Sequence, residues 1–155
     1  MTLTPVGVAR PRFSLRSGLT PAWRRNTLTP VDLARAQESL KAADLCLREG
    51  FVNSAASRAY YAIFQAAQVA LEISGVTRTE WSHPGLQAAF TTELIHRRKV
   101  YPAPFRDYLS SGLAVRQAAD YGRSGVSRKV AQRLGRRAAT FLSAVEEATH
   151  RGSTF

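Results

Sequence analysis

The sequence of 155 residues has little cysteine and no long hydrophobic run. Its one cysteine, Cys46, excludes an internal disulfide framework and a zinc site built on cysteines. Cys46 lies among alanines and leucines in a helical pattern, so we expect a small buried apolar residue. Since no run approaches 18 consecutive apolar residues, we expect no membrane span. The three histidines fall in different predicted elements without metal-ligand spacing, so we expect no metal and no other cofactor; they are His83, His96 and His150.

Several enzyme signatures are also missing. The chain has no G-x-x-x-x-G-K-[ST] phosphate loop, no G-x-S-x-G nucleophile elbow and no pair of catalytic carboxylates at a recognisable spacing. The N-terminus lacks the apolar segment of a secretory signal, and its prolines and glycines break the amphipathic helix of a transit peptide. We therefore expect a cytoplasmic protein.

Acidic residues are absent from two stretches of the chain. The sequence has 22 Lys and Arg residues, 19 of them arginine, against 11 Asp and Glu, which gives a net charge of +11. Residues 1–28 hold five arginines and residues 122–137 hold six basic residues, while the remainder holds 11 of each sign and is neutral. We expect a basic N-terminal extension over 1–28 and one helical domain over 29–150.

Five amphipathic segments predict an all-α fold, an antiparallel up-and-down bundle of four main helices plus a shorter fifth. Thr29 as cap, Pro30 and Asp32 predict the start of the first helix, which ends at Gly50. The later helices are expected over about 52–74, from Pro84 onward, over about 105–121 and over about 127–149. In the third helix Leu86, Phe90 and Leu94 should face inward, and Ser127 should cap the last helix.

Polar residues interrupt the pattern on the second and fourth helices. The second helix carries a polar seam that either faces water or lines a cleft or dimer interface; it consists of Ser54, Arg58, Tyr61, Gln65, Gln68 and Glu72. On the fourth helix Arg116 and Asp120 continue a buried stripe and stand four positions apart, so they can pair. A charged pair on an apolar face needs partners. It either ties the fourth helix to the second, through Arg58, or forms an arginine site in a cleft or across a dimer axis.

The turn into the last helix concentrates positive charge. Arg128 and Lys129 occupy the first turn, where cations oppose the helix dipole. Arginines beside free helix N–H groups are typical of anion sites. The alternatives are a solvated basic face or a site for RNA or nucleotide phosphates, made of Arg123, Arg128, Lys129, Arg133 and Arg136.

Three motifs resemble the HEPN (higher eukaryotes and prokaryotes nucleotide-binding) superfamily, most closely its small stand-alone prokaryotic branch. The first is Ala-Ser-Arg-Ala-Tyr-Tyr-Ala-Ile-Phe at 56–64. The second is Ser-His-Pro-Gly-Leu at 82–86, followed by Phe90. The third is Arg-Gln-Ala-Ala-Asp-Tyr-Gly at 116–122. The resemblance covers roughly residues 30–149.

The resemblance implies a helical bundle that forms a homodimer, often with a minimal nucleotidyltransferase as partner in a toxin–antitoxin or defence pair. Nuclease members of the superfamily carry an arginine followed four to six residues later by histidine, and cut RNA without metal. Arg116 matches that arginine, but Asp120 and Tyr121 stand where the histidine would be. We take Arg116, Asp120, Tyr121 and Arg58 as candidate catalytic residues. His83 could act in place of the histidine or could simply pack or cap.

Three functions follow from these observations. The first is a module that binds RNA or nucleotide phosphate and works with a nucleotidyltransferase. The second is a metal-independent endoribonuclease toxin, in which Arg116 stabilises developing charge and Tyr121, Asp120 or His83 transfers protons. The third is a purely structural partner whose basic extension wraps an acidic protein surface. The clustered arginines favour the first.

Overall fold

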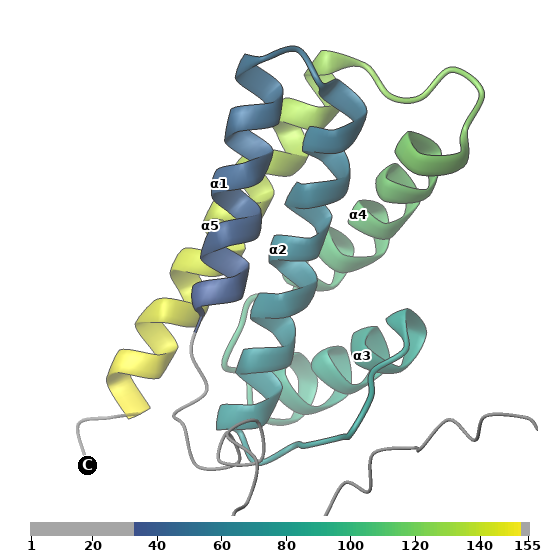
Figure 1. The fold of residues 1–155 in the computed structure, drawn as a ribbon. Helices are drawn as coiled ribbons and strands as arrows, with labels where there is room; N and C mark the ends of the chain where they lie inside the picture. Colours follow the sequence, from purple (N-terminus) through teal and green to yellow (C-terminus); the bar gives the residue numbers. More distant parts are fainter. Residues whose placement is uncertain (1–32, 153–155) are drawn as a thin grey trace, which may run out of the picture. The chain divides into compact units, whose positions relative to one another are not determined.

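The computed structural model describes residues 33–152, which form helices and turns without a strand (Figure 1). In chain order the elements are α1 (Ala34–Arg48), α2 (Val52–Ile73), α3 (His83–Ala89), the π-helix η2 (Phe90–Arg97), α4 (Pro104–Tyr121) and α5 (Arg128–Gly152). The all-α prediction is confirmed. The basic extension over 1–28 and the predicted start of the first helix at Thr29, Pro30 and Asp32 lie outside the described residues.

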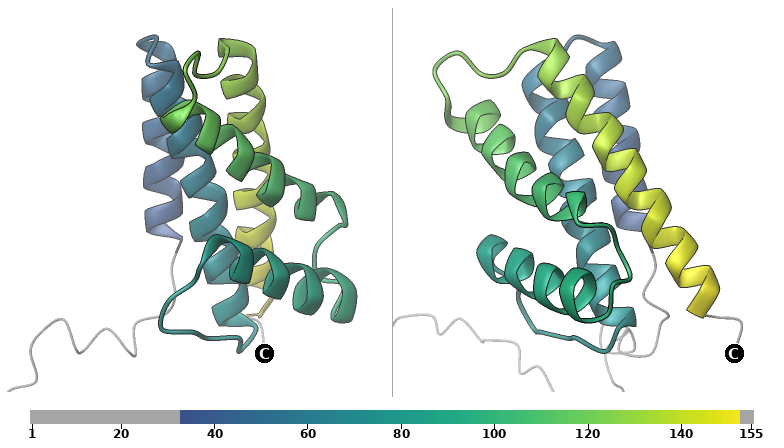
Figure 2. Two further views of the ribbon diagram at one scale, coloured as in Figure 1. Left: turned by 90° about the vertical axis from the view of Figure 1, so that its right-hand side faces the viewer. Right: turned by 180° about the vertical axis from the view of Figure 1, so that it is seen from behind.

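Helix α2 is the centre of the bundle. α1 runs antiparallel along one side of it, and α5 and α4 pack against its other sides (Figures 1 and 2). The short α3 and η2 together lie across the lower end of α2 instead of running up or down the bundle. The four main helices, α1, α2, α4 and α5, therefore match the predicted architecture. The shorter element, formed by α3 and η2, crosses the end of α2.

Glycines and hydroxyl side chains set the helix ends. Gly50 and Gly75 follow α1 and α2 with φ of 84° and 82°, a conformation that glycine adopts without steric cost. The Ser127 side chain accepts a hydrogen bond from the Val130 amide at 3.2 Å, which confirms the predicted cap of α5. Ser82 caps α3 in the same way, by accepting from the Gly85 amide at 3.1 Å.

The core combines small residues on α2 with aromatic rings from the other helices. The seven buried alanines of α2 are Ala55, Ala56, Ala59, Ala62, Ala66, Ala67 and Ala70. Rings of Phe90, Tyr101, Phe105 and Phe141 gather where η2, α4 and α5 meet, and the Phe105 and Phe141 centroids lie 4.8 Å apart. The predicted inward residues of the third helix, Leu86, Phe90 and Leu94, are fully buried. Burial of large apolar side chains stabilises the fold by about 1.5–3 kcal/mol each.

Helix α4 crosses α2 closely at Gly112. A Cβ atom there would lie 3.1 Å from Cδ2 of Tyr60 and 3.4 Å from Cδ1 of Leu134. The space between α4, α2 and α5 at this position therefore accommodates glycine but is tight for any larger side chain. The glycine thereby lets the C-terminal half of α4 lie against the polar face of α2.

Two local predictions differ from the structure. Cys46 is only partly buried and packs at the edge of the core. The third helix begins at His83, one residue before Pro84, and continues as a π-helix from Phe90. At its end the Arg98 amide donates to the Glu93 carbonyl five residues earlier, at 3.1 Å. The amphipathic pattern of residues 86–94 carries no signal for this change of helix type.

Within residues 33–152, no helix combines the length and the apolar character that crossing a membrane requires.

Candidate polar site between the second, third and fourth helices

Arg116 and Asp120 form an ion pair one turn apart on α4. Their Nε and Oδ2 atoms lie 2.9 Å apart, and the side chains are 17% and 28% exposed. The predicted pairing is therefore confirmed. The Nε–H does not point at the carboxylate well enough for a hydrogen bond, so the contact is an ion pair. Charges this sheltered from water need further partners.

Helix α2 supplies those partners. Nη2 of Arg116 donates to the Tyr61 hydroxyl at 3.2 Å. The Ser57 hydroxyl donates to Oδ2 of Asp120 at 3.4 Å. The pair thus ties α4 to α2, as one of the sequence-based alternatives proposed. The link runs through Tyr61 and Ser57 and not through Arg58.

Aromatic rings surround the two arginines of this site. The Arg58 guanidinium carbon lies 4.7 Å from the Tyr61 ring centroid, and that of Arg116 lies 5.4 Å from the same ring. Arg116 is also 5.8 Å from the ring of Tyr121, which is 77% exposed. Each such contact stabilises the cation by about 0.5–1 kcal/mol at an exposed position. Tyr61 therefore links Arg58 to Arg116, and Tyr121 covers Arg116 from the solvent side.

His83 joins the site from the start of α3. Its Nδ1 lies 2.7 Å from the Tyr60 hydroxyl oxygen, and its ring centroid lies 4.9 Å from that of Phe64. Burial lowers the pKa of His83 below its ordinary value near 6.5, and the positive charge of Arg116 lowers it further. Burial also raises the pKa of Tyr60. A neutral imidazole beside a protonated phenol can accept or donate a proton.

The structure brings six residues singled out from the sequence into one polar cluster: Arg58, Tyr61, His83, Arg116, Asp120 and Tyr121. Ser57 and Tyr60 were not predicted as part of it. Tyr60 is fully buried, and its hydroxyl reaches His83 across 23 residues of chain. Its place in an apolar stripe concealed that contact. Ser57 could have been noticed as a hydroxyl four positions before Tyr61 on an alanine-rich helix.

The predicted phosphate-binding residues form a second group, which we call the basic segment. Its members are all exposed and make no ion pair with an acidic residue in the part of the chain that the structure describes; they are Arg123, Arg128, Lys129, Arg133 and Arg136. The neighbouring Arg137 differs, because it donates to the Ser111 hydroxyl at 3.0 Å and lies over the Tyr108 ring. Arg137 therefore packs against α4, whereas the five residues of the basic segment have no ion-pair partner among the residues that the structure describes.

Asn53 connects the basic segment to the polar cluster. Its Oδ1 accepts a hydrogen bond from the Val126 amide at 2.9 Å, which holds the loop before α5 against the first turn of α2. Asn53 stands one helical turn before Ser57. The loop with Arg123 also follows directly from Tyr121 at the end of α4. Both groups of residues therefore lie at the same end of the bundle.

Among residues 33–152, no three His, Cys, Asp or Glu side chains gather closely enough to hold a metal ion. The chemistry available to the cluster is that of a guanidinium, a carboxylate, phenols and an imidazole. These groups can bind phosphate oxygens and transfer protons.

Comparison of the chain with curated proteins gives no significant match. A family model for the HEPN domain matches residues 32–148, which cover all of α1 to α4 and most of α5. The matched region includes all three sequence motifs and every residue of the polar cluster. The chain therefore belongs to the HEPN domain family.

Proposed function

We propose that this chain is a cytoplasmic module that binds RNA or nucleotide phosphate through the basic segment. The observation that carries this proposal is that five exposed cations beside the polar cluster of Arg116 have no acidic partner within residues 33–152. Membership of the HEPN family supports an RNA- or nucleotide-related role.

The arrangement on α5 suits a phosphate backbone. Lys129, Arg133 and Arg136 recur at spacings of four and three, so they share one face over about 10 Å of helix axis. That length allows contact with more than one phosphate. Arginine adds a planar fork that holds phosphate through two hydrogen bonds. Backbone contacts of this kind release counterions, so the affinity should fall steeply with salt.

Filter binding of single-stranded RNA at several salt concentrations tests the proposal. We expect the double variant Arg133→Glu, Arg136→Glu to bind at least about tenfold more weakly than the wild type. It should also reduce the salt slope by about two, one for each lost phosphate contact. The matched control is Arg35→Glu, Arg48→Glu, which makes the same change of charge at exposed positions on α1. Equal losses in both double variants, or affinity without salt dependence, would contradict the proposal.

A second candidate function, metal-independent RNA cleavage, is favoured by the position of His83. The 2′-hydroxyl oxygen would attack the adjacent phosphorus while the bond to the 5′ oxygen breaks. His83 would take the proton of the hydroxyl, and the Tyr121 phenol would return one to the leaving oxygen. Arg116 would stabilise the charge that develops on the phosphate. We rank this function second because no histidine follows Arg116 at the spacing found in nuclease members of the superfamily.

Incubation of total RNA in EDTA distinguishes the two functions. Cleavage by the wild type that is lost in both Arg116→Ala and His83→Ala would establish the nuclease. Arg106→Ala serves as control, because it removes an exposed arginine that pairs only with its neighbour Asp107 among the described residues. Equal cleavage by all four proteins, or none, would exclude it.

We further propose that the module acts as a homodimer that meets through α2 and α4, with a minimal nucleotidyltransferase as partner in a toxin–antitoxin or defence pair. The exposed Tyr121 ring at the end of α4 supports a contact there. Light scattering coupled to gel filtration should give twice the chain mass of 17.0 kDa. Co-purification with the product of an adjacent nucleotidyltransferase gene tests the proposed partner. A monomeric chain that retains no such enzyme would contradict both the homodimer and the partner.

A further inference from the structure

A hollow of about 670 Å³ lies at the other end of α2 from the basic segment. Its walls come from the turn after α2 (residues 75–78), one face of α3 and the outer face of η2, with Arg98 at the edge. The volume falls in the range of about 300–1,000 Å³ that is typical of small-ligand sites. Four small residues, Gly75, Gly85, Ala88 and Ala89, leave this space open.

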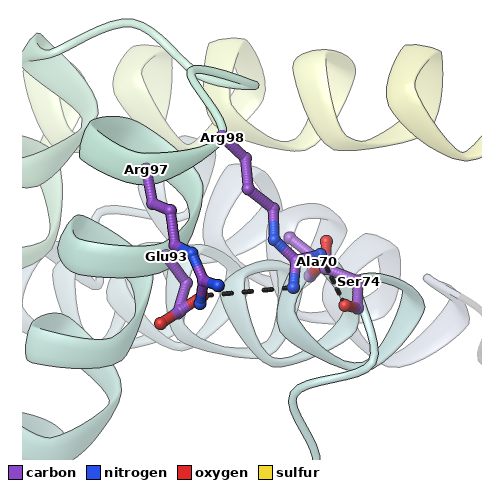
Figure 3. A network of polar contacts seen from close by, with 5 residues as sticks. All are labelled: Ala70, Ser74, Glu93, Arg97 and Arg98. Carbon is purple, nitrogen blue, oxygen red and sulfur yellow. Dashed lines mark hydrogen bonds and ion pairs between the residues drawn. The ribbon is translucent and has the colours of Figure 1, made fainter.

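The charge of the lining is strongly positive. Arg78, Arg97 and Arg98 face a single acid, Glu93. Oε2 of Glu93 lies 3.2 Å from Nη1 of Arg97 and 4.0 Å from Nη2 of Arg98 (Figure 3). One carboxylate shared by two guanidiniums leaves one positive charge uncompensated, and Arg78 adds another.

Each of these arginines contacts another group of the protein. Nη1 of Arg98 donates to the Ser74 carbonyl at 2.6 Å, where α2 ends (Figure 3). The Arg78 guanidinium lies 4.8 Å from the Trp81 ring centroid. Arg98 stands directly after η2 and before Lys99, whose φ is 53°. Side chains that are already ordered lose less entropy when an anion binds.

We propose that this hollow binds a small phosphate-bearing ligand. The phosphate would lie between Arg78, Arg97 and Arg98, because guanidinium forks match phosphate oxygens. The organic part would lie on Ala88 and Ala89, and the Thr77 and Thr92 hydroxyls stand in the lining as further donors. The proposal is independent of RNA binding. The 22 residues of α2 separate the hollow by about 30 Å from the loop before α5, where the basic segment begins.

NMR titration of the full chain with inorganic phosphate, and separately with adenosine monophosphate, tests the site. We expect saturable shifts confined to amides of residues 75–78 and 85–98, and binding at least about fivefold weaker in Arg97→Ala and in Arg78→Ala. Arg98 is left intact because it also holds the end of α2. The control Arg48→Ala removes the same charge at the opposite end of α2 and should bind within about twofold of the wild type.

The two probes identify what the hollow recognises. Tighter binding of adenosine monophosphate than of inorganic phosphate would show that Ala88 and Ala89 contact the organic part of the ligand. Equal binding of the two probes would show that the site recognises the phosphate group alone. Both results support the proposal. It is overturned if neither probe gives saturable shifts at up to about 10 mM, or if the two pocket variants bind as the control does. RNA affinity of the variants, measured in parallel, should stay within about twofold of the wild type.

Discussion

The Tyr60 hydroxyl oxygen lies 2.7 Å from Nδ1 of His83, which joins the centre of α2 to the first residue of α3. The pKa of His83 is lowered by burial and then by the charge of Arg116, so the folded chain favours the neutral imidazole. Around and below pH 6.5 the unfolded chain therefore binds more proton on this histidine than the folded chain does. The burial of His83, together with the charge of Arg116, therefore makes the stability of the fold depend on pH.

We expect the contribution of His83 to the free energy of unfolding to be fully present above about pH 6.5 and to fall as the pH drops below it. Urea denaturation at pH 5, 6, 7 and 8 measures this dependence. The difference from His83→Gln isolates the contribution of His83 from that of other groups, since glutamine keeps a polar side chain without titrating. A pH dependence that is the same in both proteins would contradict the assignment.

The ion pair of Arg116 and Asp120 should couple the two side chains energetically. Asp120→Ala leaves a guanidinium that is 17% exposed without its carboxylate, and we expect it to lower stability by about 1–2 kcal/mol. A double-mutant cycle with Arg116→Ala should give a coupling energy of about 1 kcal/mol. If the changes in the free energy of unfolding caused by the two single substitutions were additive in the double variant, the two side chains would not be coupled.

Gly112 and Gly135 should respond to alanine with opposite signs. At Gly112 the new Cβ would lie 3.1 Å from Cδ2 of Tyr60, so we expect a loss of about 1–3 kcal/mol through overpacking. At Gly135, inside α5, a Cβ atom would meet no described residue within 4 Å apart from the backbone of its own helix, so the better helix propensity of alanine should stabilise by about 0.5–1 kcal/mol. Thermal denaturation of both variants measures the signs, and equal shifts of Tm would refute the close approach of α4.

Asn53 should control the order of the loop before α5. Asn53→Ala removes the acceptor for the Val126 amide, and we expect a loss of about 1 kcal/mol. Exchange of the Val126 amide hydrogen should become several times faster, as followed by NMR. Asn53→Asp keeps an oxygen at the same position and should preserve slow exchange. Fast exchange in the wild type would argue against the anchor.

Lys99 should carry local backbone strain. Its φ of 53° is unfavourable for a residue with a Cβ, so Lys99→Gly should stabilise by about 0.5 kcal/mol, after the larger entropy of glycine in the unfolded chain is subtracted. Lys41→Gly, at an exposed position inside α1, should instead destabilise by about 1 kcal/mol. Urea midpoints that fall for both variants would contradict the assignment of strain.

The features that the sequence predicted are local ones. Helix positions followed from apolar spacing, and the pair of Arg116 and Asp120 followed from their separation by one helical turn. The contacts that were not predicted join distant segments. Asn53 meets Val126 across 73 residues, and Tyr60 meets His83 across a loop whose path no spacing rule gives. The π-helix η2 was also missed, because its inward residues fit an α-helical stripe equally well.

The seven buried alanines of α2 determine which mutations this protein can tolerate. Where a core consists of large side chains, truncation leaves cavities that cost about 2–5 kcal/mol. At the seven alanine positions of α2 only a methyl group stands between the helices, whereas the larger side chains of Tyr60, Ile63 and Leu71 are buried beside them on the same helix. Substitution at these seven positions should therefore be selected chiefly against enlargement, with serine accepted where valine is not. The alanines preserve the close helix spacing on which the contacts of Ser57 and Tyr61 with α4 depend.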